Sequence, residues 1–568
     1  MLLNNGKKRI PIGYEDFKQI IDGQFYYVDK SMFIYELLHN GGQNNLITRP
    51  RRFGKTLNFS MLKYFFDITE KDNAYLFDGL KISEYYDELA MYRNTHPVIT
   101  LSLKCAKQGD FERAVYNIKG EIQGQFKKYR YVWESDRIDK SDRDSAEAIM
   151  DTNADETILG NSIKLLCSCL KQYYGVNTII LIDEYDVPLE DAYFSGYYDK
   201  MVRFIRSLFE SALKTNPALE FSVITGCLRI SKESIFTGLN NLKINTILSV
   251  KYSEYFGFEE YEVVDLLKYY GLENKIDIIK KWYDGYLFGK TEIYNPWSIM
   301  YYVDDLNSNP DEFPKANWIN TSSNNIIRTL IEQSDDATKS VIERLIHGGS
   351  VETRISETIT YGDLTNKNEN IWSFLLFTGY LRINKLLETG ETTGNGAVYS
   401  LVIPNMEIKS CYNDIIMQYF DAYKKEIDKD YLYKSLLSGD AAGFAVPITK
   451  LLKSSISFYD NTESFYHGLV SGLLAGNTDY EMKSNRETGD GRSDLILYQR
   501  DKFINAVIIE FKICRDNEEI DAAADRALRQ INEMDYAAEA REKGYRNILK
   551  YGVAFKNKIC YAVAECEK

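Results

Sequence analysis

The stretch LITRPRRFGKTL, residues 46–57, decides the fold of the first part of the chain. An apolar run leads into a loop that ends in Gly54, Lys55 and Thr56, and we expect a helix to follow. This is the end of the phosphate-binding pattern GxxxxGK[ST], in which the glycine lets the backbone approach a phosphate and the helix N-terminus presents free N–H groups. In that pattern the lysine reaches the β and γ phosphates and the threonine hydroxyl binds Mg²⁺.

The loop departs from the pattern at its start. Arg49 stands where the first glycine is expected, and Pro50 has no N–H to offer a phosphate. Arg51 and Arg52 are available to replace those contacts with side-chain contacts to an anion, or to serve another ligand. A basic turn before a helix is the alternative interpretation.

A second stretch, IILIDEYD at residues 179–186, supports the nucleotide interpretation. An apolar strand ends in Asp183, expected to hold Mg²⁺ through water, and Glu184, expected to polarise the attacking water. The next apolar run, FSVITG, ends shortly before Arg229, where such enzymes place a γ-phosphate sensor. The alternative is a buried strand capped by solvated acids. Because GKT precedes DE, as in P-loop ATPases, we predict ATP binding and ATP hydrolysis.

The apolar runs of the first half lack strict alternation, which indicates strands buried on both faces of a parallel sheet. Helical stretches lie between them, so we predict an α/β domain with the parallel sheet of a P-loop NTPase. The expected strands are 45–48, 97–103, 178–183, 220–225 and 244–250, and the expected helices include 57–66 and 197–213.

A separate constellation lies in GDGRSDLILYQRDKFINAVIIEFK, residues 489–512. Glu510 and Lys512 are two apart on an apolar strand, so their side chains share one face, and Asp494 begins the preceding strand. Two carboxylates on neighbouring strands suit Mg²⁺, and the lysine is placed to position water or stabilise charge at phosphorus. This is the D…ExK arrangement of PD-(D/E)XK nucleases. The alternative is a solvated ion pair on an edge strand.

Flanking residues extend this constellation. Glu463 is a candidate further carboxylate, and His467 is either an acid–base group or a core or capping histidine. Gln530 and Tyr536 follow on the next helix, at a spacing wider than the Q-x-x-x-Y of exonuclease relatives. We expect helices at 464–474 and 518–538, and strands at 494–498, 506–512 and 559–564.

Composition narrows the classes of protein. At 568 residues, with 44% hydrophobic and 27% charged residues, the chain suits three to four globular domains. It has no apolar stretch of about 18 residues and no apolar signal region near Met1, so we expect no membrane span and a cytoplasmic location. Eight cysteines without a repeated CxxC spacing indicate reduced thiols. The net charge of −14 disfavours a globally basic nucleic-acid-binding protein, though not a local basic groove.

Taken together, these segments resemble a bacterial family that joins an AAA-ATPase-like N-terminal domain to a C-terminal PD-(D/E)XK nuclease-superfamily domain. The matching segments include IPIGYEDF, YYVDKSMFI, RPRRFGKTL, LIDEYDVPL, WYDGYLFG, YNPWSI, WINTS, FYHGL and IIEFK. The resemblance implies nucleotide chemistry at Lys55, Thr56, Asp183 and Glu184, and phosphodiester hydrolysis at Asp494, Glu510 and Lys512.

We therefore expect a P-loop ATPase coupled to a Mg²⁺-dependent nuclease that acts on DNA or RNA. The expected parts are a P-loop domain at 1–250 with a helical insertion at about 107–161, a helical lid at 251–310, a mixed helical linker at 311–460, and a nuclease-like α+β domain at 461–568. One alternative is an ATP-dependent signalling or scaffold switch whose C-terminal domain binds nucleic acid or protein without cutting. Another is a nuclease with a nucleotide sensor that does not hydrolyse. A homo-oligomer stays open, because Arg51, Arg52 and Arg229 can act in cis or on a neighbour's nucleotide.

Overall fold

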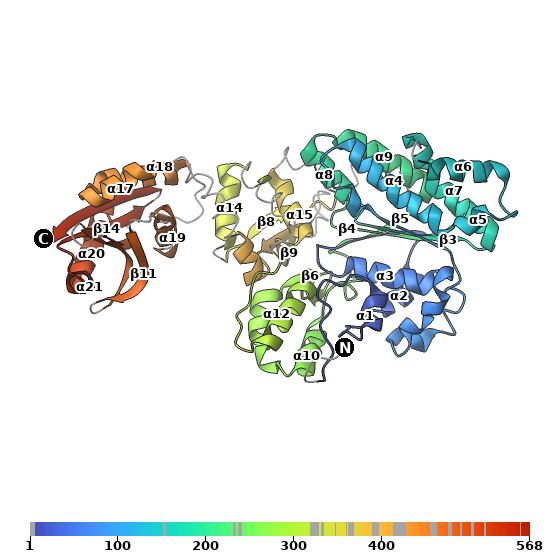
Figure 1. The fold of residues 1–568 in the computed structure, drawn as a ribbon, viewed down its shortest axis with the longest axis horizontal. Helices are drawn as coiled ribbons and strands as arrows, with labels where there is room; N and C mark the ends of the chain where they lie inside the picture. The colour runs from blue at the N-terminus through green and yellow to red at the C-terminus, as the bar shows by residue number, and fades with distance from the viewer. Residues whose placement is uncertain are drawn as a thin grey trace. The chain divides into compact units, whose positions relative to one another are not determined.

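Two units that interleave along the sequence make up the chain (Figure 1). The first contains Met1–Leu330 and Ser350–Cys411, and the second contains Ile331–Gly349 and Tyr412–Lys568. The computed structural model describes residues 6–151, 155–230, 235–236, 241–318, 329–330, 334–346, 348–358, 361, 368–388, 397–412, 428–454, 463–474, 480–488, 491–500, 505–515, 518–556 and 558–567.

The first unit is built on a five-stranded parallel sheet in the order β2-β3-β4-β1-β5. Every residue of β1 and β3 is buried, so neither strand alternates between polar and apolar residues as a half-exposed strand does. Helices cover both faces, with α3 on one and α4, α7 and α9 on the other (Figure 1). The predicted α/β parallel sheet is therefore confirmed. The strands are β1 (Asn44–Thr48), β2 (Val98–Ser102), β3 (Thr178–Asp183), β4 (Leu219–Gly226) and β5 (Leu242–Asn245).

One strand prediction is partly wrong. The fifth strand ends at Asn245 and does not continue to residue 250. The N–H of Thr246 donates to Ser249 Oγ, and the N–H of Ser249 donates back to the Thr246 carbonyl oxygen, so the chain turns where a strand was expected. A polar turn thus overrides the β-branched composition of this run.

The helices of the first unit come from several parts of the sequence. Those around the parallel sheet are α1 (Phe17–Asp22), α2 (Met32–Asn40), α3 (Lys55–Phe66), α4 (Phe111–Lys128), α5 (Arg130–Trp133), α6 (Lys140–Met150), α7 (Glu156–Tyr174), α8 (Val187–Ser195) and α9 (Tyr198–Leu213). The later ones are α10 (Glu260–Tyr270), α11 (Ile276–Tyr283), α12 (Pro296–Ser308) and α15 (Asn368–Thr378). A hairpin of β6 (Tyr286–Phe288) and β7 (Thr291–Ile293), and an antiparallel sheet of β8 (Val351–Arg354), β10 (Val398–Val402) and β9 (Arg382–Glu388), complete the unit.

The N-terminal segment packs against the helices α10–α12, although more than 200 residues separate them in sequence. Ile10 is part of their apolar core, and Ile12 and Val28 pack against it. The Lys30 ammonium lies 2.6 Å from both carboxylate oxygens of Glu262 on α10, and both side chains are buried. The N-terminal segment and these helices therefore form one wall beside the sheet.

A buried carboxylate joins helix α12 to the segment that follows it. Glu407 accepts hydrogen bonds from Ser298 Oγ at 2.8 Å and from the Trp318 N–H at 3.0 Å. The Trp318 indole N–H donates in turn to the carbonyl oxygen of Arg51, at 3.4 Å. Burial raises the pKa of Glu407 to about 7, which these hydrogen bonds only partly offset.

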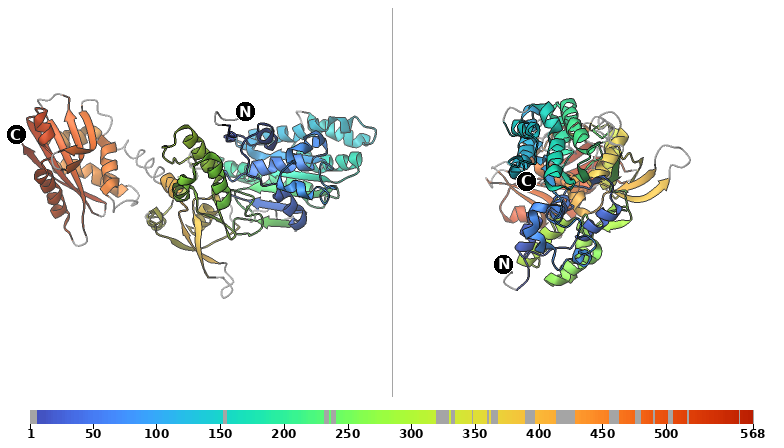
Figure 2. Two further views of the ribbon diagram at one scale, coloured as in Figure 1. Left: turned by 90° about the horizontal axis from the view of Figure 1, so that it is seen from below. Right: turned by 90° about the vertical axis from the view of Figure 1, so that its right-hand side faces the viewer.

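The second unit contains a mixed five-stranded sheet in the order β11-β12-β13-β14-β15, in which only the β13–β14 pair is parallel (Figure 2). Its strands are β11 (Tyr480–Thr488), β12 (Gly491–Gln499), β13 (Asn505–Ile513), β14 (Asn547–Lys556) and β15 (Ile559–Glu567). Its helices are α14 (Asp336–Ile346), α17 (Lys429–Ser438), α18 (Ala441–Ser454), α19 (Glu463–Leu474), α20 (Ile520–Glu533) and α21 (Ala538–Glu542).

The crossover from β13 to β14 runs through α20, which packs directly on the sheet. A Cβ at Gly552 of β14 would lie 2.1 Å from the Ala524 carbonyl oxygen and 2.7 Å from the Leu528 nitrogen, so only glycine permits this approach. The other face of the sheet meets α19, where Tyr466 stacks on Phe555. The predicted α+β character of this region is confirmed.

The raised pKa of Glu407 predicts a pH dependence of stability. Because the folded pKa exceeds the ordinary value of 4.5, the stability contributed by Glu407 is complete below pH 4.5 and is lost as the pH rises through about 7. Glu407→Gln keeps an acceptor for Ser298 but carries no charge. In the Glu407→Gln variant, we expect the melting temperature of the first unit to exceed that of the unmodified chain by a few degrees at pH 8, with little difference at pH 5.

The measurement is calorimetry of the full chain between pH 5 and pH 8. Glu112→Gln, at an exposed position on α4, is the matched control and should follow the unmodified chain. The same pH profile in Glu407→Gln and in the unmodified chain would contradict the assignment.

Candidate functional site

The loop between β1 and α3 wraps around the ammonium group of Lys55. Lys55 Nζ donates to the carbonyl oxygens of Arg49 at 2.9 Å and Pro50 at 2.8 Å. Gly54 takes a left-handed backbone with φ of +80°, and Arg52 does so with φ of +71°. The sharp turn thus places Lys55 and Thr56 at the first turn of α3, where free N–H groups are available to an anion.

The carboxylate of Asp183, at the end of β3, joins the first turn of α3 to the end of β4. It accepts hydrogen bonds from Thr56 Oγ1 at 2.8 Å, from the hydroxyl of Thr225 at the end of β4, and from the N–H of Glu184 at 3.0 Å. Because β1, β4 and β3 are parallel neighbours, the Lys55–Thr56 and Asp183–Glu184 motifs, which follow β1 and end β3, meet at the carboxyl ends of these strands. Thr56 and Asp183 together offer the hydroxyl and carboxylate oxygens that Mg²⁺ prefers.

Glu184 is held in an unusual backbone conformation. Its φ of +54° lies in the left-handed region, which costs a non-glycine residue about 1–3 kcal/mol. Burial and the neighbouring Asp183 raise the pKa of its carboxyl, while the charges of Lys55 and Lys104 oppose that shift. A carboxyl of raised pKa at the end of β3 suits a general base.

Two residues that follow the predicted acids fix the segment after β4. Tyr185 donates its hydroxyl to the Leu228 carbonyl oxygen at 2.5 Å, and Asp186 accepts from the Cys227 N–H at 2.8 Å. Gly226 is required between them, because a Cβ there would lie 2.6 Å from the Tyr185 ring. The motif DEYD contains Tyr185 and Asp186, but its sequence alone indicates no role for either residue.

Arg49, in place of the first glycine of the pattern, points away from the phosphate side. Its fully buried guanidinium donates to the carbonyl oxygens of Thr48 at 2.8 Å, Asn245 at 3.1 Å and Tyr252 at 3.3 Å. Burial lowers its pKa to about 9. Arg49 therefore connects the loop to β5 and to the segment after it.

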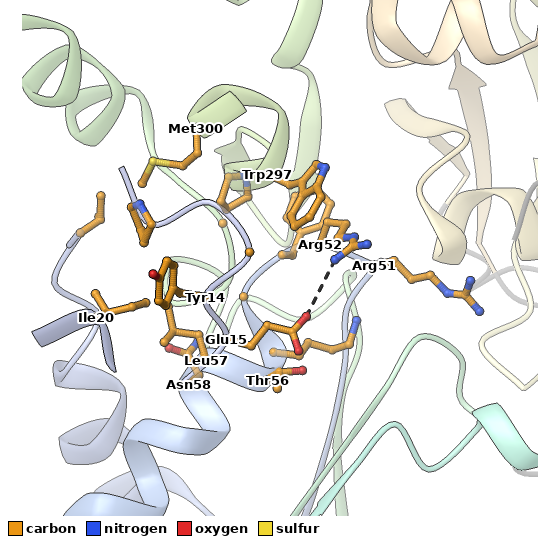
Figure 3. A pocket seen from close by; sticks show the side chains of 18 of the residues that line it. Tyr14, Glu15, Ile20, Arg51, Arg52, Thr56, Leu57, Asn58, Trp297 and Met300 are labelled. Atoms are coloured by element: carbon orange, nitrogen blue, oxygen red, sulfur yellow. Dashed lines mark ion pairs between the residues drawn. The ribbon is translucent and has the colours of Figure 1, made fainter. Parts of the chain in front are cut away.

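The three other predicted arginines lie in different surroundings. Arg51 donates to both carboxylate oxygens of Glu190 on α8, at 2.9 and 2.8 Å, and Figure 3 shows its side chain turned away from Thr56. Arg52 lies over the Trp297 ring, with its guanidinium carbon 3.8 Å from the ring centroid. Arg229 lies beyond β4 and is not part of the pocket lining. Of the three, Arg52 is thus the best placed to meet a ligand.

A pocket of about 410 Å³ opens beside the loop (Figure 3). One part of its wall is charged or polar, with Lys55, Thr56, Lys104, Lys107 and Glu184, and another part is apolar. The apolar part comes from the N-terminal segment and from the region around α10 and α12, and it includes Ile12, Tyr26, Val28, Phe258 and Met300. A cationic end beside an apolar end suits a nucleoside polyphosphate, with its phosphates at Lys55 and its base among the apolar side chains.

In the second unit, the predicted Asp494, Glu510 and Lys512 come together on β12 and β13. Lys512 Nζ donates to Glu510 Oε1 at 2.8 Å, and Asp494 Oδ2 accepts from the Phe511 N–H at 2.8 Å. Glu510 is only 2% exposed, and burial together with Asp494 raises its pKa to about 7. Its Oε2 has no hydrogen-bond partner among the residues that the structure describes.

These features fit a divalent cation. Lys512 meets only Oε1 of Glu510, so Oε2 is buried beside the carboxylate of Asp494, which is costly unless a cation joins the two carboxylates. No cluster of three or more His, Cys, Asp or Glu side chains suited to a metal occurs within the described part of the chain. Asp494 and Glu510 would therefore hold the ion as a pair, which suits Mg²⁺ because this ion keeps several of its waters.

Of the flanking residues, His467 lies next to Asp494. His467 Nε2 is 2.8 Å from the Asp494 carbonyl oxygen, and its ring meets the ring of Phe511 edge-on. Gln530 donates to the Tyr536 hydroxyl at 3.1 Å, and Tyr536 is buried in an apolar cluster with Tyr498 and Ile508. Glu463 begins α19, and its side chain lies outside what the structure describes.

Comparisons with known proteins agree with the two predicted kinds of domain. Residues 11–236 match the family described as "Predicted AAA-ATPase", and residues 461–565 match the PD-(D/E)XK nuclease superfamily. The "Uncharacterized protein in vnfD 5'region" of Azotobacter chroococcum mcd 1 is 24% identical over 554 residues, 95% of each chain. Within the described residues, no helix is both long enough and apolar enough to cross a membrane. The chain thus combines an AAA-ATPase-like domain at residues 11–236 with a PD-(D/E)XK nuclease-superfamily domain at residues 461–565.

Proposed function

We propose that this protein binds and hydrolyses ATP in its first unit and cuts nucleic-acid phosphodiester bonds in its second, with Mg²⁺ at both sites. The observation that carries the proposal is that two separate sets of motif residues each assemble. Thr56 meets Asp183 at 2.8 Å, and Lys512 meets Glu510 at 2.8 Å beside Asp494. The first set meets at the end of a predicted strand, and the second shares one face of a predicted strand, as the proposed chemistry requires.

In the nucleotide site, Lys55 would exchange the carbonyl oxygens of its own loop for the β and γ phosphates. Thr56 and Asp183 would hold Mg²⁺, which when bound neutralises charge on the phosphates. Glu184 would accept a proton from the attacking water, for which its raised pKa is suited. Arg52, Arg51 and Arg229 complete the proposed set, and the first two line the pocket.

In the nuclease site, Asp494 and Glu510 would hold Mg²⁺, which when bound polarises the phosphate and its attacking water. Lys512 is placed by its hydrogen bond to Glu510 and would stabilise the negative charge that develops at phosphorus. The substrate is DNA or RNA, because the site chemistry concerns the phosphodiester that both contain.

The proposal also includes the domain boundaries, the cellular compartment and the oligomeric state of the protein. The P-loop domain spans 1–250 with a helical insertion at about 107–161, the lid 251–310, the linker 311–460, and the nuclease-like domain 461–568. The proposed compartment is the cytoplasm, and the proposed role of ATP is to regulate cutting. A homo-oligomer would form if Arg51, Arg52 or Arg229 served a neighbour's nucleotide.

The nuclease assignment predicts the behaviour of Lys512→Ala. Labelled linear DNA, circular DNA and structured RNA are incubated with the full chain and Mg²⁺ or Mn²⁺, with and without ATP. We expect cutting of at least one substrate, reduced about 100-fold or more in the variant, because a group that stabilises the transition state is lost. Lys450→Ala, at an exposed position on α18, should cut like the unmodified chain. Unaltered cutting by Lys512→Ala would remove this site from the reaction, and no cutting at all would favour a binding switch.

The ATPase assignment predicts a different result for Glu184→Gln. ATP turnover should fall about 100-fold or more, because the general base is lost, while ATP binding persists. Phosphate release and calorimetric binding measure the two properties separately, and Glu112→Gln is the control. ATP binding without turnover in the unmodified chain would instead indicate a nucleotide sensor.

A further inference from the structure

A carboxylate from the N-terminal segment lies at the cationic end of the pocket. Glu15 Oε1 is 3.9 Å from Arg52 Nη1, and Glu15 Oε2 is 3.7 Å from Lys104 Nζ. All three residues line the pocket together with Lys55 and Thr56. Figure 3 shows Glu15 directed toward Arg52, with Thr56 close by. An acid thus lies between two cations where nucleotide phosphates are expected.

These ion pairs are weak enough to be exchanged. Both distances exceed hydrogen-bond range, and the Glu15 side chain is 49% exposed. Ion pairs of this kind contribute at most about 1 kcal/mol. A triphosphate carries several negative charges and offers many oxygen acceptors, so it would compete strongly for the same cations.

Lys104 comes from a part of the sequence that carries no phosphate motif. It lies in the short helix η3 (Leu103–Ala106) directly after β2, and β2 pairs with β3, the strand that ends in Asp183. Lys104 lines the same pocket as Glu184, and its charge opposes the raised pKa of that carboxyl. Lys104 is therefore on the side of the pocket where the terminal phosphate would react.

We propose that Glu15 is an internal competitor of the nucleotide phosphates, which holds Arg52 and Lys104 until a nucleotide displaces it. The two cations then bind the phosphates, with Lys104 on the terminal one. This inference rests on the proposed nucleotide function and deepens it. It adds Lys104 as a phosphate-binding residue and Glu15 as a residue that sets affinity.

The first test is calorimetric binding of ATP, ADP and inorganic triphosphate to the full chain at low salt. Glu15→Gln keeps the size of the side chain but removes its charge, so we expect about fivefold tighter binding of ATP and of inorganic triphosphate. Glu112→Gln removes the same charge on an exposed face of α4 and should leave affinity unchanged. Equal or weaker binding by Glu15→Gln would overturn the proposal.

The second test separates Lys104 from a merely structural residue. Lys104→Ala should weaken the binding of ATP more than that of ADP, because only ATP carries a γ-phosphate. Lys127→Ala, at an exposed position on α4, is the matched control. An equal loss for ATP and ADP would overturn the role of Lys104.

The underlying nucleotide function has its own controls. If the unmodified chain binds no ATP, or if Lys55→Ala leaves ATP binding unchanged, both the nucleotide function and this inference fail. If ATP binds through Lys55 but Glu15→Gln does not tighten it, only this inference fails.

Discussion

The carboxylate of Asp183 is the interaction on which the first unit depends most. It is almost fully buried and accepts from Thr56, Thr225 and the backbone of Glu184, so it joins the first turn of α3, the end of β4 and the residue after β3. A buried charge is tolerable only when its oxygens are satisfied, and here three donors satisfy them. The parallel sheet brings these donors together, and their hydrogen bonds in turn fix the carboxyl ends of the strands beside the pocket.

Glu510 shows the opposite arrangement in the second unit. One of its oxygens meets Lys512, while the other has no partner among the described residues, and its pKa is raised to about 7. The carboxylate of the first site is thus satisfied by neutral donors, whereas Glu510 is only partly satisfied, by a single ammonium group.

The sequence predicted those features that local geometry determines. Residues 54–56 adjoin one another, and Glu510 and Lys512 share a face because strand side chains alternate with a period of two. Contacts between distant segments were not predictable. Arg51 meets Glu190, 139 residues away, and the apolar wall of the pocket comes from segments near Ile12 and Met300. The sequence pattern gives the residue types but not which distant partner each side chain reaches.

Strand β14 was also missed, for a physical reason. Its sequence NILKYGVAFK places Lys550 and Gly552 within an otherwise apolar run, and both residues disfavour a central strand by composition. In the fold, Lys550 Nζ meets Asn532 of α20 at 2.7 Å, and Gly552 leaves room for the backbone of the same helix. Contacts with α20 therefore accommodate both residues in the strand. The strand's own sequence does not show that this helix packs against it.

The interleaved course of the chain bears on how the protein can be divided. The second unit takes Ile331–Gly349, which includes α14, from between two segments of the first. The backbone consequently passes between the units three times. A recombinant fragment beginning at Tyr412 would lack part of its own unit, and a single protease cut would not yield two complete pieces. Separating the two units of this protein thus requires cuts after Leu330, Gly349 and Cys411 together.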